Sequence, residues 1–357
     1  SGLSVDVENS TSYIALFPKE EIIAEDFQDL AVLNESGKTW FGYLSYELGV
    51  GIANLQEAEK SHINLPKTWL INFSVIFSFC HENKKLSVVF DDESRLEKVL
   101  GYCENESVRK QIKAKNLESN FSDQEYLNEI CDIKRMIANG DFYQTNLTRK
   151  FFGKLEIEDK NSASYFSIFA DLCKISPANY SSFLSFKKNY IISSSPELFL
   201  SIDKEGENRI VKSLPIKGTS PRSDDPEQDQ KNKLELQNSP KERAENLMIV
   251  DLVRNDLSRV CKAGSVEAKK LFEIISYKTI HHMMSQIEGE IDENHNVIDV
   301  IQACFPAGSM TGAPKIKAMQ VAAQKERIQR GVYSGTIGMI SPEKVNLSVV
   351  IRTLICK

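Results

Sequence analysis

The chain contains one long helical stretch around which the rest can be interpreted, Ser239-Pro-Lys-Glu-Arg-Ala-Glu-Asn-Leu-Met-Ile-Val-Asp-Leu-Val-Arg254. Its first residue is a typical N-cap, proline fits the first helical turn, and the glutamate three positions after the cap completes a capping box. The pattern therefore predicts a helix with Glu245 centred on its apolar face and Asp256 on the same line. The apolar residues within about 60° of Glu245 on the helix wheel are Met248, Ile249 and Leu252.

A glutamate on an apolar helical face needs a partner, because burying an unpaired carboxylate is costly. Two interpretations of Glu245 stay open. One is a salt bridge to Arg243, Arg254 or a distant lysine. The other is a hard-cation ligand, since Mg²⁺ binds one or two carboxylates plus ligand oxygens.

Length and charge restrict the class of protein. The 357 residues, 41% of them hydrophobic, suffice for one large mixed α/β body with a single core. The formal charge of −6 argues against a nucleic-acid surface but allows a local basic site for an anionic metabolite. The chain begins without a basic, then apolar, leader and contains no apolar run of membrane-spanning length, so we expect neither export nor membrane insertion.

The seven cysteines indicate a reducing compartment. They are scattered, odd in number and never in a Cys-x-x-Cys pair, which is typical of a cytoplasmic protein and not of a disulfide frame or zinc site. No His-Glu-x-x-His or comparable transition-metal spacing exists among the five histidines.

The order of patterns predicts two parts of one body. Residues 1–118 are rich in short strands and end in a polar stretch, whereas residues 119–357 contain the chemistry-bearing segments. In the second part, Ser122 and Glu125 form a capping box for a helix that ends at Gly140. Strands are expected at 143–152, 180–186 and 190–194, and a terminal hairpin at 331–340 and 345–355.

Several side chains stand out, each beside an ordinary structural alternative. Lys217, between an apolar residue and a glycine in Pro215-Ile-Lys-Gly-Thr-Ser-Pro-Arg222, is placed to meet a ligand but could be a surface lysine in a turn. Arg352, in the middle of the second hairpin strand, needs a carboxylate, either from a ligand or from an internal acid. Tyr333, in the neighbouring strand, could donate to the same anion.

Three further features have equally plain alternatives. The segment 305–315 leaves backbone N–H groups at a helix entry, which suit an anion but are also found in simple caps. His282 lies in a period-2 run and could be a core histidine, and Glu197 could be an ordinary loop acid.

Taken together these segments resemble the chorismate-utilising enzymes, which include component I of anthranilate synthase, component I of aminodeoxychorismate synthase, and the isochorismate and salicylate synthases. The resemblance extends from Phe121 to the end of the chain, and Trp40-Phe-Gly-Tyr-Leu-Ser-Tyr-Glu-Leu-Gly49 resembles the family's N-terminal region. The matching pieces, in the family's order, are Ser195-Pro-Glu197, Pro215-Ile-Lys-Gly-Thr219, Glu242 to Asp256, His281-His282, Gly308-Ser-Met-Thr-Gly-Ala-Pro-Lys315, Gly331-Val-Tyr-Ser-Gly335 and Ile351-Arg-Thr353.

Lys217 indicates the subfamily. Anthranilate synthases typically carry alanine at this position of Pro-Ile-x-Gly-Thr, whereas aminodeoxychorismate synthase component I carries lysine. The resemblance then implies a nucleophilic lysine that adds to C2 of chorismate with loss of the C4 hydroxyl, after which ammonia enters at C4 and expels the lysine. An amine is nucleophilic only when neutral, so Lys217 would need partial desolvation or a nearby cation.

The resemblance also implies roles for the other residues. Glu197 would be a general acid/base, His282 would hydrogen-bond the leaving group, and Glu245 would bind Mg²⁺. Ser309, Thr219, Tyr333 and Arg352 match positions that contact substrate. A separate glutaminase subunit would supply ammonia. The implied fold is α/β (α+β), with two stacked, mainly antiparallel sheets flanked by helices as in anthranilate synthase component I.

The end of the chain differs from the family pattern. Members continue after the Ile351-Arg-Thr353 strand with a Gly-rich turn and a helix that carries a second Mg²⁺-binding glutamate, whereas this chain ends at Lys357. We therefore expect the sequence to be an incomplete version of a longer chain. The alternatives are an anthranilate synthase, an isochorismate synthase or a catalytically silent ligand-binding homologue.

Overall fold

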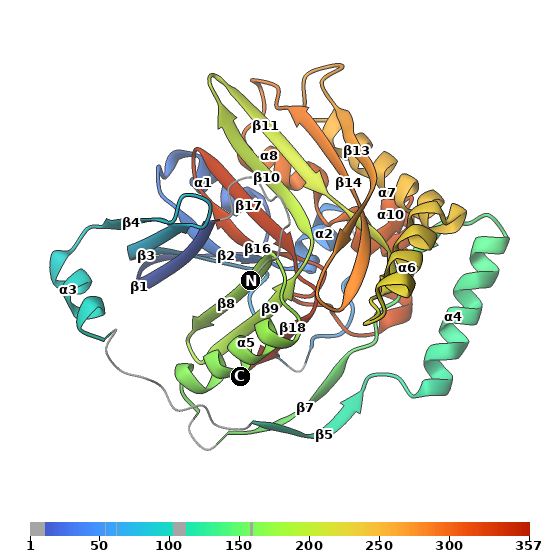
Figure 1. Cartoon of the computed structure of the whole chain (residues 1–357), viewed down its shortest axis with the longest axis horizontal. Helices are drawn as coiled ribbons and strands as arrows, with labels where there is room; N and C mark the ends of the chain where they lie inside the picture. The colour runs from blue at the N-terminus through green and yellow to red at the C-terminus, as the bar shows by residue number, and fades with distance from the viewer. Residues whose placement is uncertain (1–10, 54, 62, 103–111, 158–159) are drawn as a thin grey trace.

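A computed structural model describes residues 11–53, 55–61, 63–102, 112–157 and 160–357. Figure 1 labels its helices and strands. The helices are η1 Gln28–Ala31, α1 Val32–Glu35, α2 Tyr46–Ile52, α3 Glu93–Tyr102, α4 Asp123–Ala138, α5 Ser162–Ile175, α6 Pro226–Asn238, α7 Pro240–Ser258, α8 Val297–Cys304, α9 Gly308–Thr311 and α10 Lys315–Glu326. In the described part of the chain, no helix is long and apolar enough to cross a membrane.

Within these described residues the strands form one large sheet and three small ones, and every strand pair is antiparallel. The large sheet has the order β1-β3-β2-β16-β17-β10-β11-β14-β12, with β4 on β3 and β13 on β14. The strands are β1 Thr11–Ala24, β2 Trp40–Leu44, β3 Thr68–Cys80, β4 Lys85–Phe90, β5 Lys113–Ser119, β6 Gln144–Thr145, β7 Phe151–Glu156, β8 Tyr180–Phe186, β9 Asn189–Ser195, β10 Leu198–Glu205, β11 Asn208–Leu214, β12 Ile216–Pro221, β13 Glu267–Ser276, β14 Ile280–Glu290, β15 Gly312–Ala313, β16 Thr336–Ile340, β17 Lys344–Val349 and β18 Thr353–Cys356.

The pairing of β2 with β16 joins the N-terminal strands to the C-terminal hairpin within the large sheet. The strand-rich beginning is therefore part of the same body as the rest. Strand β5 also pairs with β7, across the predicted boundary at residues 118 and 119. That boundary stays a prediction, and part of the polar stretch that suggested it lies outside the described residues.

A second sheet, with the order β18-β9-β8, packs against the first. Their interface is a buried cluster in which Tyr43 and Trp69 come from the large sheet and Phe186 and Ile191 from the small one. Burial of such aromatic and aliphatic side chains stabilises the contact through the hydrophobic effect. The predicted class, stacked antiparallel sheets flanked by helices, is confirmed.

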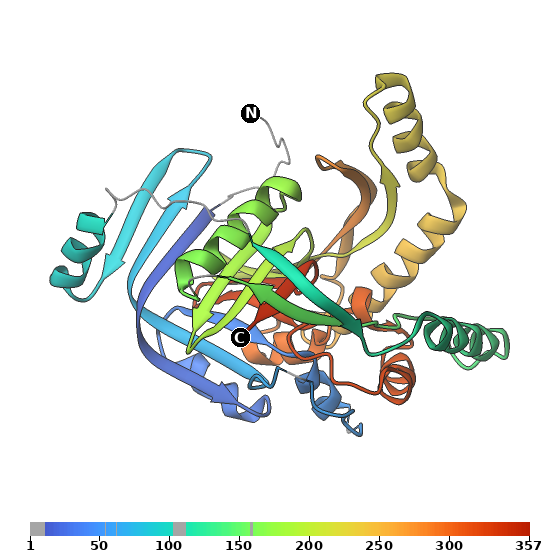
Figure 2. The same cartoon turned by 90° about the horizontal axis from the view of Figure 1, so that it is seen from below.

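Helix α7 covers one end of the large sheet beside β12 and β14, and it is followed in the core by α8 (Figure 1). Viewed from below in Figure 2, α3 and α4 project on opposite sides of this body. The buried face of α7 consists of Asn246, Ile249, Val250, Val253, Asp256 and Leu257. Glu245 lies at the edge of this face instead of at its centre, because Asn246 is buried while Leu247 is exposed and Leu252 is only partly buried. That detail of the helix-wheel prediction was wrong.

The terminal hairpin differs from its prediction in the second arm. Strand β17 ends at Val349, and β18 leaves the large sheet to pair with β9. Arg352 lies at the break between them with a φ of 50°, a conformation that few non-glycine residues adopt. Tyr333 precedes β16 in a turn. The two residues are therefore not cross-strand neighbours, contrary to the prediction.

The helix ends that were predicted from capping residues agree better with the structure than the predicted strands do. Ser122 and Glu125 form the reciprocal capping box of α4, and Gly140 follows its end with a φ of 84°. The predicted continuous strand at 143–152 was wrong, since the chain there forms the short β6 and then β7. The break places Gln144 beside Ala313, a pairing that matters for the site.

Candidate active site

Strand β12 presents the predicted lysine at a bulge. Its register against β14 shifts between Ile216 and Thr219, and Gly218 between them has a φ of 94°. A side chain at Gly218 would be strained in that conformation and would press on Met283 of β14 at 3.2 Å. The bulge directs Lys217 toward α7 and Thr219 toward His282, so one short strand supplies both groups.

Lys217 faces Glu245 of α7. The lysine Nζ lies 3.8 Å from Glu245 Oε1, and only 18% of the lysine side chain is exposed. The same Glu245 oxygen accepts a 2.7 Å hydrogen bond from Gln144 Nε2. Of the two interpretations of Glu245, the structure therefore shows a partner lysine, which is compatible with a further role toward a ligand.

Glu197 is the buried acid of the site. It lies in the turn between β9 and β10 with 4% of its surface exposed. Burial raises the pKa of Glu197 to about 7, against the opposing influence of the Ser309 hydroxyl, the Lys217 charge and the Ile216 N–H. A carboxyl group with this pKa both donates and accepts protons near neutral pH.

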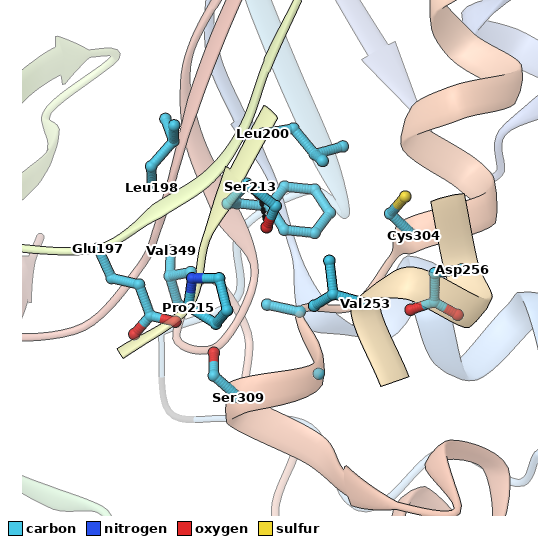
Figure 3. A pocket seen from close by; sticks show the side chains of 13 residues that line it. Glu197, Leu198, Leu200, Ser213, Pro215, Val253, Asp256, Cys304, Ser309 and Val349 are labelled. Atoms are coloured by element: carbon cyan, nitrogen blue, oxygen red, sulfur yellow. Dashed lines mark hydrogen bonds between the residues drawn. The ribbon is translucent and has the colours of Figure 1, made fainter. Parts of the chain in front are cut away.

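Ser309 approaches Glu197 from α9. Figure 3 shows the Glu197 carboxylate and the Ser309 hydroxyl at one end of a small cavity and Asp256 at the other. The cavity has a volume of about 10 Å³, roughly what one water molecule needs. The Ser309 Oγ is buried without a hydrogen bond of good geometry within the described residues. Its hydroxyl is therefore available to a ligand.

Thr219, His282 and Arg352 form a hydrogen-bonded chain. His282 Nδ1 lies 3.0 Å from Thr219 Oγ1, and Arg352 Nη2 lies 2.8 Å from His282 Nε2. Because a guanidinium only donates, Nε2 is the acceptor and the ring proton is on Nδ1. Burial and the Arg352 charge lower the pKa of His282 to about 4, so the imidazole is neutral. Three predicted site residues are thus brought together.

Tyr333 lies in the turn before β16, where the neighbouring Ser334 N–H donates to the Val350 carbonyl oxygen at 3.0 Å. It lines a larger cavity of about 1,530 Å³ between the second sheet, β7 and the loop before β3. No hydrogen bond or ion pair of the described residues joins it to Lys217, Glu197 or Arg352. Its predicted contact with substrate stays a prediction.

The segment 305–315 is more elaborate than a helix entry. It forms the short helix α9 and then β15, before α10 begins at Lys315 as predicted. Lys315 Nζ lies 2.5 Å from Asp256 Oδ2 and 2.7 Å from the Cys304 carbonyl oxygen; Asp256 is buried, and the Lys315 side chain is 10% exposed. This ion pair ties the end of α7 to the start of α10, and the other Asp256 oxygen, Oδ1, accepts a 2.8 Å hydrogen bond from Arg259 Nη2.

Few side chains of the site could bind the predicted Mg²⁺ ion. Among the described residues no cluster of three or more His, Cys, Asp or Glu side chains could hold a metal. Glu245 is the carboxylate predicted to bind it, and its contacts with Gln144 and Lys217 both use Oε1. One carboxylate together with ligand oxygens and water fits the usual Mg²⁺ environment, so the residues present are compatible with the ion.

This arrangement suits an anionic substrate that undergoes both nucleophilic attack and proton transfer. A largely buried amine and a buried carboxyl group share one site, with the Arg352 guanidinium connected to it through His282. Sequence reasoning missed Gln144, whose only signal was a polar residue in a predicted strand. Its partner Glu245 lies 101 residues away, so no local pattern could reveal the contact.

Comparison with known proteins shows which proteins this chain is similar to. The family model described as chorismate binding enzyme matches residues 11–357. The chain is 32% identical over 315 residues to aminodeoxychorismate synthase component 1 of Escherichia coli K12, covering 88% of this chain and 67% of that protein. It is 36% identical over 249 residues to anthranilate synthase component 1 of Aquifex aeolicus, covering 70% of this chain and 48% of that protein.

Among solved structures, anthranilate synthase component I of Streptococcus pneumoniae superimposes with a TM-score of 0.85 at 25% identity. The superposition covers 99% of this chain and 86% of that one. Overall identity does not separate the two activities, since relatives of both kinds match at similar levels. The fold and the family match over nearly the whole chain agree, and the chain belongs to the chorismate-binding enzyme family.

Proposed function

We propose that this protein is an aminodeoxychorismate synthase component I, which converts chorismate and ammonia to 4-amino-4-deoxychorismate. The observation that carries the proposal is the position of Lys217. Its amine is largely buried, close to Glu245 and within electrostatic reach of the buried acid Glu197. Relatives named aminodeoxychorismate synthase in Escherichia coli and Streptomyces griseus support the same activity.

The covalent step balances without an external oxidant or reductant. The neutral Lys217 amine forms a bond to C2 of chorismate, both ring double bonds shift (C1=C2 to C1=C6 and C5=C6 to C4=C5), and the C4–O bond breaks. The departing hydroxyl takes a proton and leaves as water. Ammonia then bonds to C4, both double bonds shift back, and the C2–N bond to lysine breaks. Glu197, with a pKa of about 7, is suited to supply the first proton and to accept one from the incoming nitrogen.

Substrate binding would rearrange the Thr219–His282–Arg352 chain. A guanidinium binds a carboxylate more strongly than a neutral imidazole, because the ionic hydrogen bonds are charge-assisted and bidentate. We infer that Arg352 turns from His282 Nε2 to a substrate carboxylate. Nε2 then becomes free to accept a hydrogen bond near C4, while Thr219 holds the ring through Nδ1. Ser309 and Tyr333 would add hydroxyl contacts.

Mg²⁺, when bound, would neutralise the ring carboxylate of chorismate, and Glu245 would hold the ion. Gln144 and Lys217 orient this glutamate through Oε1. Binding of Mg²⁺ alone, followed by calorimetry, tests the assignment. We expect Glu245→Gln to weaken that binding at least about tenfold, and unchanged binding would contradict it.

A glutaminase subunit, a role in p-aminobenzoate and folate synthesis, and a cytoplasmic location complete the proposal. The partner is suggested by the words "component 1" in the names of relatives. Purified protein should use ammonium directly and should use glutamine only after a glutaminase subunit is added. Turnover of glutamine by the protein alone would contradict a separate partner.

A product assay tests the activity itself. The protein is incubated with chorismate, Mg²⁺ and ammonium, and 4-amino-4-deoxychorismate is converted to p-aminobenzoate by added lyase. We expect p-aminobenzoate that depends on both ammonium and lyase. Anthranilate without lyase would indicate an anthranilate synthase, and isochorismate without ammonium an isochorismate synthase. Chorismate binding without turnover would favour a silent homologue.

A further inference from the structure

Lys217, which is largely buried, faces Glu245 without forming a tight ion pair. Charge-assisted N–H···O bonds are usually about 2.7–2.9 Å long, and Lys315 lies 2.5 Å from Asp256 in the neighbouring ion pair. Lys217 stays 3.8 Å from Glu245 Oε1. The Lys217 amine therefore does not form a tight ion pair with the Glu245 carboxylate.

Gln144 occupies the oxygen that Lys217 approaches. Its Nε2 donates to Glu245 Oε1 at 2.7 Å, which is shorter than the 3.8 Å between Lys217 Nζ and the same oxygen. An amide N–H uses one lone pair of this oxygen and carries no net charge, so it fills part of the acceptor capacity of the carboxylate without adding a second cation.

The backbone of Gln144 is fixed by the turn after α9. Strand β6 pairs with β15, placing Gln144 opposite Ala313, and the Tyr143 N–H donates to the Ala313 carbonyl at 2.8 Å. Gly312 permits this approach, because a Cβ there would lie 2.1 Å from the Gln144 carbonyl oxygen. The contact with Glu245 therefore comes from a position that the fold determines tightly.

The other end of the amide gives independent evidence of a functional role. Gln144 Oε1 is buried and has no hydrogen-bond partner within the described residues. A buried carbonyl oxygen without a partner is costly, and an apolar side chain of similar size would avoid that cost. The amide is therefore retained for its N–H group, or for a ligand that meets its oxygen.

We propose that Gln144 is a positioning residue for Lys217. By occupying Glu245 Oε1 it prevents a tight Lys217–Glu245 ion pair and keeps the amine accessible to an electrophile. The catalytic consequence rests on the proposed function, since only a nucleophilic lysine benefits from being held this way. The structural consequence, the accessibility of the amine, is independent of the reaction.

The reactivity of the Lys217 amine tests this role directly. Wild type, Gln144→Leu and Gln144→Glu are acetylated at one fixed pH with sulfosuccinimidyl acetate, and modification of Lys217 is measured by peptide mass spectrometry relative to the exposed Lys278. We expect both variants to label Lys217 at least about fivefold more slowly, because a tight ion pair replaces the hydrogen bond. Equal or faster labelling would overturn the proposal, and mere loosening of the site would make it faster.

A double-mutant cycle shows whether Gln144 acts through Glu245. In Glu245→Gln, adding Gln144→Leu should leave the labelling of Lys217 unchanged within about twofold, and an undiminished effect would contradict the mechanism. Gln124→Leu on the exposed face of α4 is the matched control and should label like wild type. In turnover assays the Gln144 variants should lose kcat with little change in the KM for chorismate. If wild type makes no product, the proposed function fails while the labelling result still decides this inference.

Discussion

The two glutamates of the site are held in opposite environments. Glu197 has 4% of its surface exposed and sits beside a cavity no larger than a water molecule, so burial raises its pKa to about 7. The Glu245 side chain is 32% exposed and has both a lysine and an amide donor on one oxygen. The buried carboxyl group of Glu197 is therefore suited to carry a proton, whereas the Glu245 carboxylate is held in place by two donors on one oxygen.

Replacing Lys217, which lies close to Glu245 and within electrostatic reach of Glu197, should have the largest effect. Lys217→Ala is expected to lower kcat by about 10³-fold or more, as loss of a nucleophile commonly does. Steady-state assays with ammonium measure this, and Lys278→Ala serves as a lysine control on the surface. Slow residual turnover is compatible with direct attack by ammonia, whereas wild-type turnover would show that the amine takes no part.

Replacing the buried acid Glu197 should have the second-largest effect. Glu197→Gln should lower kcat by about 10²–10⁴-fold, the usual range for a general acid or base. The pH profile of kcat/KM should also lose the limb that titrates near pH 7, because Glu197 is the group with that pKa. A variant that retains the same limb would mean that another residue transfers the proton.

A third carboxylate, that of Asp256, differs from both glutamates because it is buried and also paired with a lysine. Removing it in Asp256→Ala leaves Lys315 as an uncompensated buried charge and should cost about 3–5 kcal/mol of unfolding free energy. Urea unfolding measures the loss. Glu20→Ala, which breaks the half-exposed pair with Lys38, should change stability far less. Similar losses in the two variants would contradict the structural role of the Asp256–Lys315 pair.

The smallest expected effect is a pH dependence of stability. The pKa of Glu197 rises from 4.5 in the unfolded chain to about 7 in the folded protein, so the folded state binds more protons between these values. Stability therefore falls as pH rises from 4.5 through 7, by about 3 kcal/mol in total. Glu197→Gln should remove this component, making the variant relatively more stable at pH 8 than at pH 5. Parallel stability curves for the two proteins would contradict a raised pKa.

Much of the fold could be predicted from local signals. The capping box at Ser122 and Glu125 and the N-cap at Ser239 depend on neighbours three residues apart, and both are present. Strands β8 and β9 also lie where apolar and β-branched runs indicated. Such signals are readable because sequence neighbours are also spatial neighbours in helices and hairpins.

The errors arose where distant strands decide the structure. Arg352 lies at a break, because the chain leaves β17 to pair with β9 as β18. Gln144 acquires its role from a two-residue ladder with Gly312 and Ala313. Neither pairing leaves a periodic pattern in the sequence. The candidate residues themselves were predictable mainly through the motifs that resemble the family, and their pKa values required the packed structure.

The most direct measurement of the central claim is the intact mass of the protein after incubation with chorismate and Mg²⁺ in the absence of ammonia. A nucleophilic Lys217 predicts a species heavier by chorismate less one water, mapped to the peptide that contains Lys217 and discharged when ammonium is added. The same adduct in Lys217→Ala, or turnover to 4-amino-4-deoxychorismate through wild type with no adduct under rapid quenching, would contradict it.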